Sequence, residues 1–273
     1  MPKNPQASSR TEDPYVLREM SGHVLWLTLN RPQTRNLLSL AMIAALKSAL
    51  DEANEAPDVR VIVLAARGPV FSAGHDLHEM AMDRAPEPRG AAQREILTRC
   101  ADMMMTIVHG ARPVIACVEG TATAGGCQLV STCDLAVASD SARFCTPGVN
   151  IGGFCTTPLV GIGRKIRRNH AMELALTGDM FSAEDALRFG LVNKVVAAEK
   201  TRSETEALAQ KIAAKSSIAI KLGKKAFYQQ IDMPVEEAYA FALEKMIEVG
   251  STDDAAEGTK AFFEKREPRW TDS

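Results

Sequence analysis

The sequence predicts an α/β protein whose first part alternates strands and helices and whose last part is helical. Two short β-branched runs, at residues 59–65 and 114–118, are bounded by polar or turn residues, as buried strands are. Helical patterns lie between these strands, which is typical of parallel strands joined by helical crossovers. Beyond about residue 200 only helical patterns remain.

The N-terminal elements follow from periodicity and capping. Residues His23 to Asn30 alternate apolar and other side chains, which predicts a strand. Ser39 is placed to N-cap a helix that runs to about Glu55, with apolar residues on one face. The run from Val59 to Ala65 predicts the next strand.

The middle of the chain continues the alternation. Residues Pro88 to His109 predict a long helix, which Arg112-Pro113 ends. A buried strand is expected from Val114 to Val118, and a helix from Ala124 to Cys133. A short strand is then expected from Leu135 to Ala138, and beyond about Asn150 the pattern is helical.

The C-terminal part is expected to hold three or four helices between about residues 200 and 265, after one last strand at 191–196. Two capping boxes are predicted, Ser182 with Asp185 and Ser251 with Asp254. We therefore divide the chain into a disordered tail (1–13), a core (14–200) and a helical C-terminal subdomain (201–273).

Composition excludes several classes of protein. The 273 residues are 46% hydrophobic and 24% charged with a net charge of −2, so neither a nucleic acid nor a membrane surface is an expected partner. No apolar run reaches the ~20 residues of a membrane span, and no secretory signal is visible. The six cysteines lack zinc-site spacing, so we expect buried thiols, no metal, and a reducing, cytoplasmic location.

Two turns carry the chemical signal. Residues 70–80 contain Ser72-Ala73-Gly74-His75, and residues 118–128 contain Gly125-Gly126 at the start of a helix. Each turn follows a predicted parallel strand, and the carboxyl ends of such strands lie on one side of a sheet. The main-chain N–H groups of His75 and Gly125 are therefore expected to converge on one oxygen, as an oxyanion hole. The alternative is that these turns are only connectors or tight helix–sheet contacts.

The whole chain from about residue 14 to 268 resembles the crotonase (enoyl-CoA hydratase/isomerase) superfamily. The resemblance is carried by Phe71 to Leu77, Gly120 to Gln128, Cys133 to Ser139, Thr177 to Val192, Asn30-Arg31-Pro32 with Asn36, and Ala261 to Arg266. It implies a spiral of ββα units with a helical C-terminal subdomain. It also implies a homotrimer or a dimer of trimers.

The resemblance implies an enzyme of fatty acid metabolism, a lyase or isomerase acting on acyl-CoA thioesters. Coenzyme A enters as part of the substrate, and no other cofactor is expected. The thioester oxygen would lie between the N–H groups of His75 and Gly125, and the catalytic residues implied are His75, Gly125 and Gln128. The substrate-binding residues implied are Ala73, Asp76, Leu77, His78, Gly126, Gly148, Phe262 and Lys265. The last two would reach the adenine and phosphates, often in a neighbouring subunit.

This sequence departs from the hydratases of the family at both catalytic glutamates. Gln128 stands at the first position and Gly148, in a Pro147-Gly148 pair, at the second. Adding water to a C=C bond needs a base and an acid, each contributing about 10²–10⁴-fold. A glutamine amide can orient water but cannot accept its proton at neutral pH. Efficient hydration by the family's two-carboxylate route is therefore not expected.

Two alternatives remain open. Decarboxylases of malonyl-type CoA esters have a turn like Ser72 to His78 and a stretch like Thr146 to Asn150, and their chemistry needs oxyanion stabilisation but no base. A tyrosine of those enzymes corresponds to Cys155 here, so this match is partial. The other alternative is a non-catalytic acyl-CoA binder. The closest overall likeness is to the enoyl-CoA hydratase domain-containing subgroup.

Overall fold

The computed structural model describes residues 13–82, 88 and 90–273. Apart from Asp13, the tail predicted for residues 1–13 lies outside the described residues.

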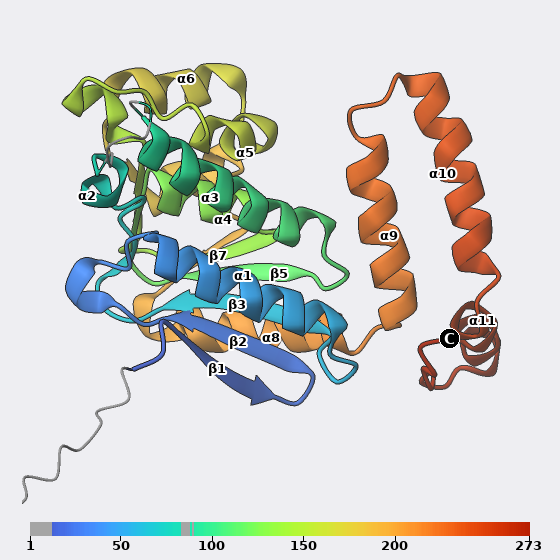
Figure 1. Ribbon diagram of the computed structural model, residues 1–273. Helices are drawn as coiled ribbons and strands as arrows, with labels where there is room; N and C mark the ends of the chain where they lie inside the picture. The colour runs from blue at the N-terminus through green and yellow to red at the C-terminus, as the bar shows by residue number, and fades with distance from the viewer. Residues whose placement is uncertain (1–12, 83–87, 89) are drawn as a thin grey trace, which may run out of the picture.

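A six-stranded sheet forms the centre of the fold (Figure 1). Its strands, in spatial order, are β1 (Val16–Ser21), β2 (Val24–Leu29), β3 (Val61–Ala66), β5 (Val114–Val118), β7 (Leu135–Ser139) and β10 (Lys194–Val196). Strand β1 pairs antiparallel with β2, and all the other neighbours are parallel. The predicted strands are confirmed with ends shifted by a few residues, whereas β1 was not predicted.

Helices cover both faces of this sheet. On one face α1 (Leu40–Glu55) and α3 (Ala91–His109) bury apolar side chains such as Leu46 and Ile107. The predicted N-cap is confirmed, because Ser39 accepts a hydrogen bond from the Met42 N–H at 3.2 Å. On the other face α8 (Thr201–Ala213) packs Ala209 and Ala213 against strand residues that include Trp26.

A second, smaller sheet lies beside the first. It contains β4 (Val70–Ser72), β6 (Thr121–Thr123), β8 (Arg143–Cys145) and β9 (Phe181–Ser182), with the first three parallel and β9 antiparallel to β8. The chain three times enters the large sheet, then the small sheet, and then a helix, which is the expected spiral of ββα units. Strands of two or three residues leave no periodicity in a sequence. They were therefore not predicted, and the expectation of helices only beyond Asn150, apart from one last strand, is wrong at β9.

Short helices follow the strands of the small sheet. They are α2 (Leu77–Met80) after β4, α4 (Gly125–Thr132) after β6 and the 3-10 helix η2 (Pro147–Ile151) after β8. The chain continues through α5 (Pro158–Lys165), α6 (Arg168–Thr177) and α7 (Ala183–Phe189), with 3-10 turns at Pro32–Thr34 and Ala198–Lys200. The capping box of Ser182 and Asp185 is confirmed at the start of α7, and Gly190 ends that helix with φ 91°.

The last three helices, α9 (Ser217–Gln230), α10 (Val235–Gly250) and α11 (Asp253–Glu264), stand away from the sheets (Figure 1). Asp134, just after α4, ties α9 to the core. Its carboxylate accepts hydrogen bonds from Lys224 Nζ at 2.8 Å and from the Tyr228 hydroxyl at 2.9 Å. Lys224 also donates to the carbonyl oxygens of Ile107 and Arg112, so its charge is fully partnered.

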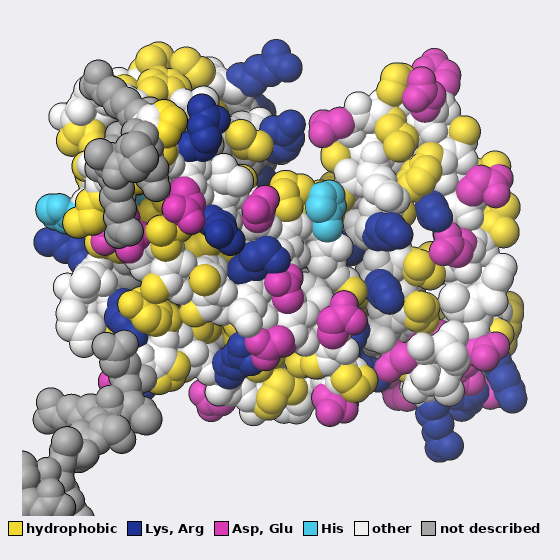
Figure 2. Space-filling model, viewed as in Figure 1, with side chains coloured by type: hydrophobic (Ala, Val, Ile, Leu, Met, Phe, Trp, Pro, Cys, Tyr) yellow, Lys and Arg dark blue, Asp and Glu magenta, His cyan; other side chains and the backbone are white. Residues whose placement is uncertain are grey.

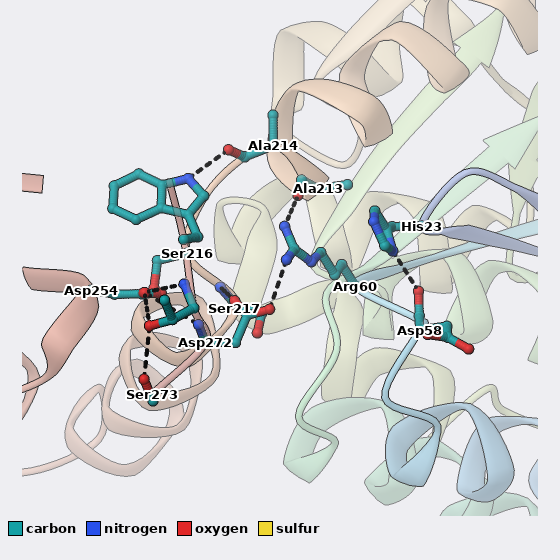
Figure 3. A network of polar contacts seen from close by, with 12 residues as sticks. His23, Asp58, Arg60, Ala213, Ala214, Ser216, Ser217, Asp254, Asp272 and Ser273 are labelled. Carbon is teal, nitrogen blue, oxygen red and sulfur yellow. Dashed lines mark hydrogen bonds and ion pairs between the residues drawn. The ribbon is translucent and has the colours of Figure 1, made fainter. Parts of the chain in front are cut away.

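The end of the chain returns to the core (Figure 3). Asp272 forms an ion pair of 2.6 Å with Arg60, which precedes β3, and accepts a hydrogen bond from the Ser217 N–H. Asp254 accepts one from the Thr271 N–H at 2.7 Å. The capping box predicted for Ser251 and Asp254 is wrong by one residue: Thr252 caps α11, and Asp254 is buried to hold this tail.

The division at residue 200 stays a prediction, although α8 packs on the large sheet whereas α9–α11 do not cover it. The outer helices expose large apolar side chains, seen as yellow atoms over this region in Figure 2. They include Phe227, Ile231, Val235, Tyr239, Leu243, Met246, Ile247, Phe262 and Phe263. Within the described ranges, every helix is too short or too polar to cross a lipid bilayer.

Candidate functional site

Three turns that carry predicted site residues lie at the carboxyl ends of three neighbouring parallel strands. Residues 73–76 follow β4, residues 124–125 follow β6 and residues 146–148 follow β8. The three strands are paired in the order β4-β6-β8, so their ends lie side by side. The Ala124 N–H donates to the Cys145 carbonyl at 2.9 Å, which joins the second turn to the third strand. The short strands that were not predicted from the sequence therefore bring the three turns together.

Buried Asn36 holds the first turn in place. Its side chain accepts a hydrogen bond from the Arg31 N–H at 2.8 Å and donates to the carbonyls of Arg67 and Val70 at 2.9 and 2.8 Å. Its own carbonyl accepts from Ser72 Oγ at 2.8 Å. From the sequence, Asn36 was noted only as part of the family motif that also contains Asn30-Arg31-Pro32. Its structural task is to fix the approach to the turn through a fully satisfied polar network.

The turn itself is bonded on both sides. The Gly74 N–H donates to Ser72 Oγ at 3.2 Å, and the Gly74 carbonyl accepts from the Leu38 N–H at 2.8 Å. The Ala73 carbonyl accepts from Thr123 Oγ1 at 3.0 Å, which links the turn to β6. The backbone before His75 therefore has little freedom to move.

The turn at Gly74 and the start of α4 are in contact. A Cβ placed on Gly74 would lie 2.9 Å from the Gly125 nitrogen, and one placed on Gly125 would lie 3.3 Å from the Gly74 Cα. Gly74 has φ +88°, which favours glycine. Throughout the described chain, neither the His75 N–H nor the Gly125 N–H donates a main-chain hydrogen bond. The turn that leads to the His75 amide therefore contacts the residue that carries the Gly125 amide, and neither amide has a main-chain acceptor among the described residues.

Ala124, directly before α4, has a strained backbone. Its φ of 47° and ψ of −115° lie outside the regions that residues with a Cβ commonly adopt. Such a conformation costs about 1–3 kcal/mol and persists only where the surroundings enforce it. Here the hydrogen bond from its N–H to Cys145 does so, and the Gly125 amide follows directly.

Gly126 allows close packing between α4 and the end of β4. A Cβ at this position would lie 2.2 Å from the Ser72 carbonyl oxygen, so only glycine lets α4 approach the end of β4. Gly126 is fully buried within α4. Its predicted contact with a substrate therefore stays a prediction.

His75 and Gln128 are two polar residues near the first turn of α4. The His75 Cε1 would lie 3.2 Å from a Cβ on Gly125, so the imidazole lies over the first turn of α4. Gln128 follows Gly125 by three residues, on the same helix face, and is 7% exposed. Burial lowers the pKa of His75, which keeps the imidazole neutral.

The space beside Gly148 is filled by Cys155. A Cβ on Gly148 would lie 3.0 Å from the Cys155 sulfur and 3.1 Å from its nitrogen. The Gly153 N–H donates to the Gly148 carbonyl at 2.9 Å, which folds this loop over the start of η2. Burial raises the pKa of the Cys155 thiol. A neutral thiol thus lies where a side chain at position 148 would begin.

All six cysteines are free and buried, as predicted. In the described ranges, no three His, Cys, Asp or Glu side chains come together as a metal site would require.

A sequence model described as "Enoyl-CoA hydratase/isomerase" matches residues 19–273. The chain belongs to the enoyl-CoA hydratase/isomerase family. This confirms the resemblance to the crotonase superfamily. Among curated relatives, "Enoyl-CoA hydratase domain-containing protein 3, mitochondrial" of Mus musculus is 41% identical over 97% of this chain and 87% of its own length. The Xenopus laevis protein of the same name is 46% identical over 94% and 86%.

Solved structures of the family share the fold. An enoyl-CoA hydratase of Mycobacterium smegmatis superposes with a TM-score of 0.89 at 46% identity, covering 94% of this chain and 99% of that one. Human enoyl-CoA hydratase domain-containing protein 3 gives 0.90 at 40% identity, covering 94% and 100%. The expected subgroup is therefore confirmed.

The expectation of a cytoplasmic location is contradicted by these comparisons, because the Mus musculus and Xenopus laevis relatives both carry "mitochondrial" in their names. The physical reason is that buried free thiols indicate only a reducing environment. They do not distinguish one reducing compartment from another.

The other predicted substrate-binding residues of the family are placed as follows. Asp76 N-caps α2, accepting hydrogen bonds from the N–H groups of His78 and Glu79. Leu77 and His78 are exposed on that helix. Phe262 and Lys265 lie at the end of α11, on the opposite side of the molecule from α2 (Figure 1), so one chain does not bring them to the three turns.

Proposed function

We propose that this protein binds acyl-CoA thioesters and stabilises their enolate form between the N–H groups of His75 and Gly125. One observation carries this proposal. Gly74 contacts Gly125, and the N–H groups of His75 and Gly125 donate no main-chain hydrogen bond to the described residues. A thioester oxygen held there would gain charge as the enolate forms. Losing one such donor typically costs about 10²–10³ in rate.

The reaction class is that of the family, lyase or isomerase chemistry on a CoA ester, without the two-carboxylate route to hydration. Gln128 cannot serve as a carboxylate base. At position 148, Cys155 takes the space of a side chain. Any hydration that occurs must therefore move its protons through other groups.

Decarboxylation of a malonyl-type CoA ester is the second candidate. When the Cα–carboxylate bond breaks, its electron pair passes into the thioester as an enolate, CO₂ leaves, and a proton is later added to Cα. Only the oxyanion needs stabilisation in the first step. The absence of both carboxylates from positions 128 and 148 favours this candidate.

We further propose that the protein works as a homotrimer or a dimer of trimers. The apolar side chains exposed on α9–α11 support assembly, since contiguous apolar surface of this kind usually marks an interface. Assembly would also allow Phe262 and Lys265 of one copy to approach the turns of another. Light scattering gives the mass in solution and tests this point.

One experiment separates the candidate functions. The purified protein is titrated calorimetrically with a saturated acyl-CoA and then assayed with crotonyl-CoA and methylmalonyl-CoA. Binding with enoyl turnover supports the first candidate, and CO₂ release supports the second. Binding without turnover of either ester indicates a non-catalytic binder. Absence of binding to any CoA ester contradicts the whole proposal.

A further inference from the structure

Two buried polar atoms of residues near the start of α4 have no partner in the part of the chain that the structure describes. In the described part of the chain, neither His75 Nε2 nor Gln128 Oε1 makes a hydrogen bond, although both atoms are shielded from solvent. Leaving a buried polar group unpaired costs about 1–3 kcal/mol. Two such groups at one place in a native structure therefore require an explanation.

The imidazole of His75, from the turn after β4, borders the first turn of α4, which carries Gln128. The imidazole of His75 touches the Cβ position of Gly125, and Gln128 lies three residues further along α4. Side chains three residues apart on a helix are neighbours, with Cβ atoms about 5–6 Å apart. Both side chains therefore border the point at which the amides of His75 and Gly125 lie.

The nearby acidic side chains are already engaged. Asp76 accepts hydrogen bonds from the first turn of α2, and Glu79 accepts one from the Leu40 N–H at 2.7 Å. The thiol of Cys155 is protonated at neutral pH, since burial raises its pKa. Near the start of α4, His75 Nε2 and Gln128 Oε1 are the buried atoms that the described residues leave unpaired.

We propose that His75 Nε2 and Gln128 Oε1 form a subsite for an O–H group placed beside the bound acyl chain. This deepens the proposed function and rests on it. An amide oxygen only accepts hydrogen bonds, whereas a neutral imidazole nitrogen donates or accepts according to its tautomer. A hydroxyl or a water satisfies both atoms. The group is either a bound water or the 3-hydroxyl of a 3-hydroxyacyl thioester.

When the group is water, the pair supplies the proton transfer that the missing carboxylates would perform. The water oxygen bonds to C3 of an enoyl thioester, and its proton passes to His75 Nε2. The C2–C3 π electrons move into the thioester, whose oxygen lies between the two amides. The imidazolium then gives its proton to C2, so that one water is added and the histidine is neutral again.

The test uses His75→Phe and Gln128→Met, which remove the two polar atoms and keep every main-chain amide. Matched controls are His109→Phe and Gln93→Met, both exposed on α3. In the first arm, calorimetry compares butanoyl-CoA with 3-hydroxybutanoyl-CoA. In the second arm, the rate of water addition to crotonyl-CoA is measured. Thermal unfolding checks the fold, and His75→Ala with Gln128→Leu replace any variant that does not fold.

If the substrate hydroxyl occupies the subsite, the wild type prefers the hydroxy ester about tenfold and both site variants lose this preference. If water occupies it, the wild type hydrates crotonyl-CoA, and hydration falls about 10²-fold in both variants. A wild type with neither preference nor turnover, or site variants that match their controls in both arms, overturns the subsite while ester binding stands. A wild type that binds no ester overturns the proposed function as well.

Discussion

The sulfur of Cys155 lies against Gly148, 3.0 Å from the position that a Cβ there would take. Such a contact is tighter than side chains normally tolerate, so the loop must give way before position 148 can carry any side chain. The absence of a side chain at this position and the close approach of residue 155 are therefore one structural feature.

The first prediction concerns restoring the carboxylates. The pair Gln128→Glu with Gly148→Glu is expected to leave crotonyl-CoA hydration unchanged and to lower stability by about 1–3 kcal/mol, because the new side chain collides with Cys155. Adding Cys155→Ala removes the sulfur contact and leaves the 3.1 Å contact with the backbone nitrogen of residue 155, so hydration is expected to rise relative to the double variant. Steady-state rates and urea unfolding measure both effects. A rise of equal size in the double variant would contradict the contact.

The second prediction concerns the anchor of α9. Lys224→Met leaves the Asp134 carboxylate without its cation, and the side chains of the pair are only 7% and 17% exposed. Removing one partner of a buried ion pair typically costs about 3–5 kcal/mol. Urea unfolding is expected to show that loss, whereas Lys225→Met, at the exposed neighbouring position, should change little. Equal stability of the two variants would show that α9 is held by other contacts.

The third prediction concerns alkaline pH. Burial raises the pKa of Cys100 from 9.0 to about 12. Because the folded pKa lies above the unfolded value, the stability contribution is complete below pH 9 and is lost as pH rises toward 12. The slope reaches about 1.4 kcal/mol per pH unit for each such thiol.

Cys100→Ala should therefore be less stable than the wild type at pH 8 and lose less stability between pH 9 and 10.5. Urea unfolding in the presence of a reductant gives both values. Val63→Ala truncates another buried side chain without removing a titrating group, and its slope should match the wild type. A Cys100→Ala slope as steep as that of Val63→Ala would refute the assignment.

The fourth prediction concerns the strained turn. Ala124→Gly removes the Cβ from a backbone with φ 47° and ψ −115°. Relief of about 1–3 kcal/mol of strain outweighs the ~0.5–1 kcal/mol entropy cost of glycine, so a net gain of about 1 kcal/mol is expected. Thermal unfolding should show a higher midpoint. Ala122→Gly, in the ordinary strand β6, should lower it, and a loss in both variants would argue against strain.

The large sheet could be predicted from the sequence because its strands bury both faces and read as continuous apolar runs, as Val114 to Val118 does. The small sheet could not, because its strands are three residues or fewer. Its position decides the site, since β4, β6 and β8 bring the three turns together. The capping signal was correct at Ser182. At the start of α11 it was misplaced by one residue: Thr252 caps the helix, because the Asp254 carboxylate is hydrogen-bonded to the C-terminal tail.

The approach of the turns at Gly74 and Gly125 was predicted as far as main-chain geometry is encoded in glycines, whereas the roles of the site residues stay predictions. The contact of Gly74 with Gly125 follows from two such positions, and the structure brings them together. The contact between Gly148 and Cys155 could not be foreseen, because no periodic pattern relates the two positions. The unpaired atoms of His75 and Gln128 also become visible only when burial is known.

Two glycines limit how this scaffold can be re-engineered. A Cβ on Gly126 would lie 2.2 Å from the Ser72 carbonyl oxygen, and a Cβ on Gly120 would lie 2.2 Å from the Pro69 carbonyl oxygen. Most variants randomised at positions 120 and 126 are expected to be unfolded or insoluble. A library aimed at new ester specificities should instead diversify 75, 128, 148 and 155 together. Positions 148 and 155 compete for the same space, so altered selectivity is expected from variants in which both are changed together.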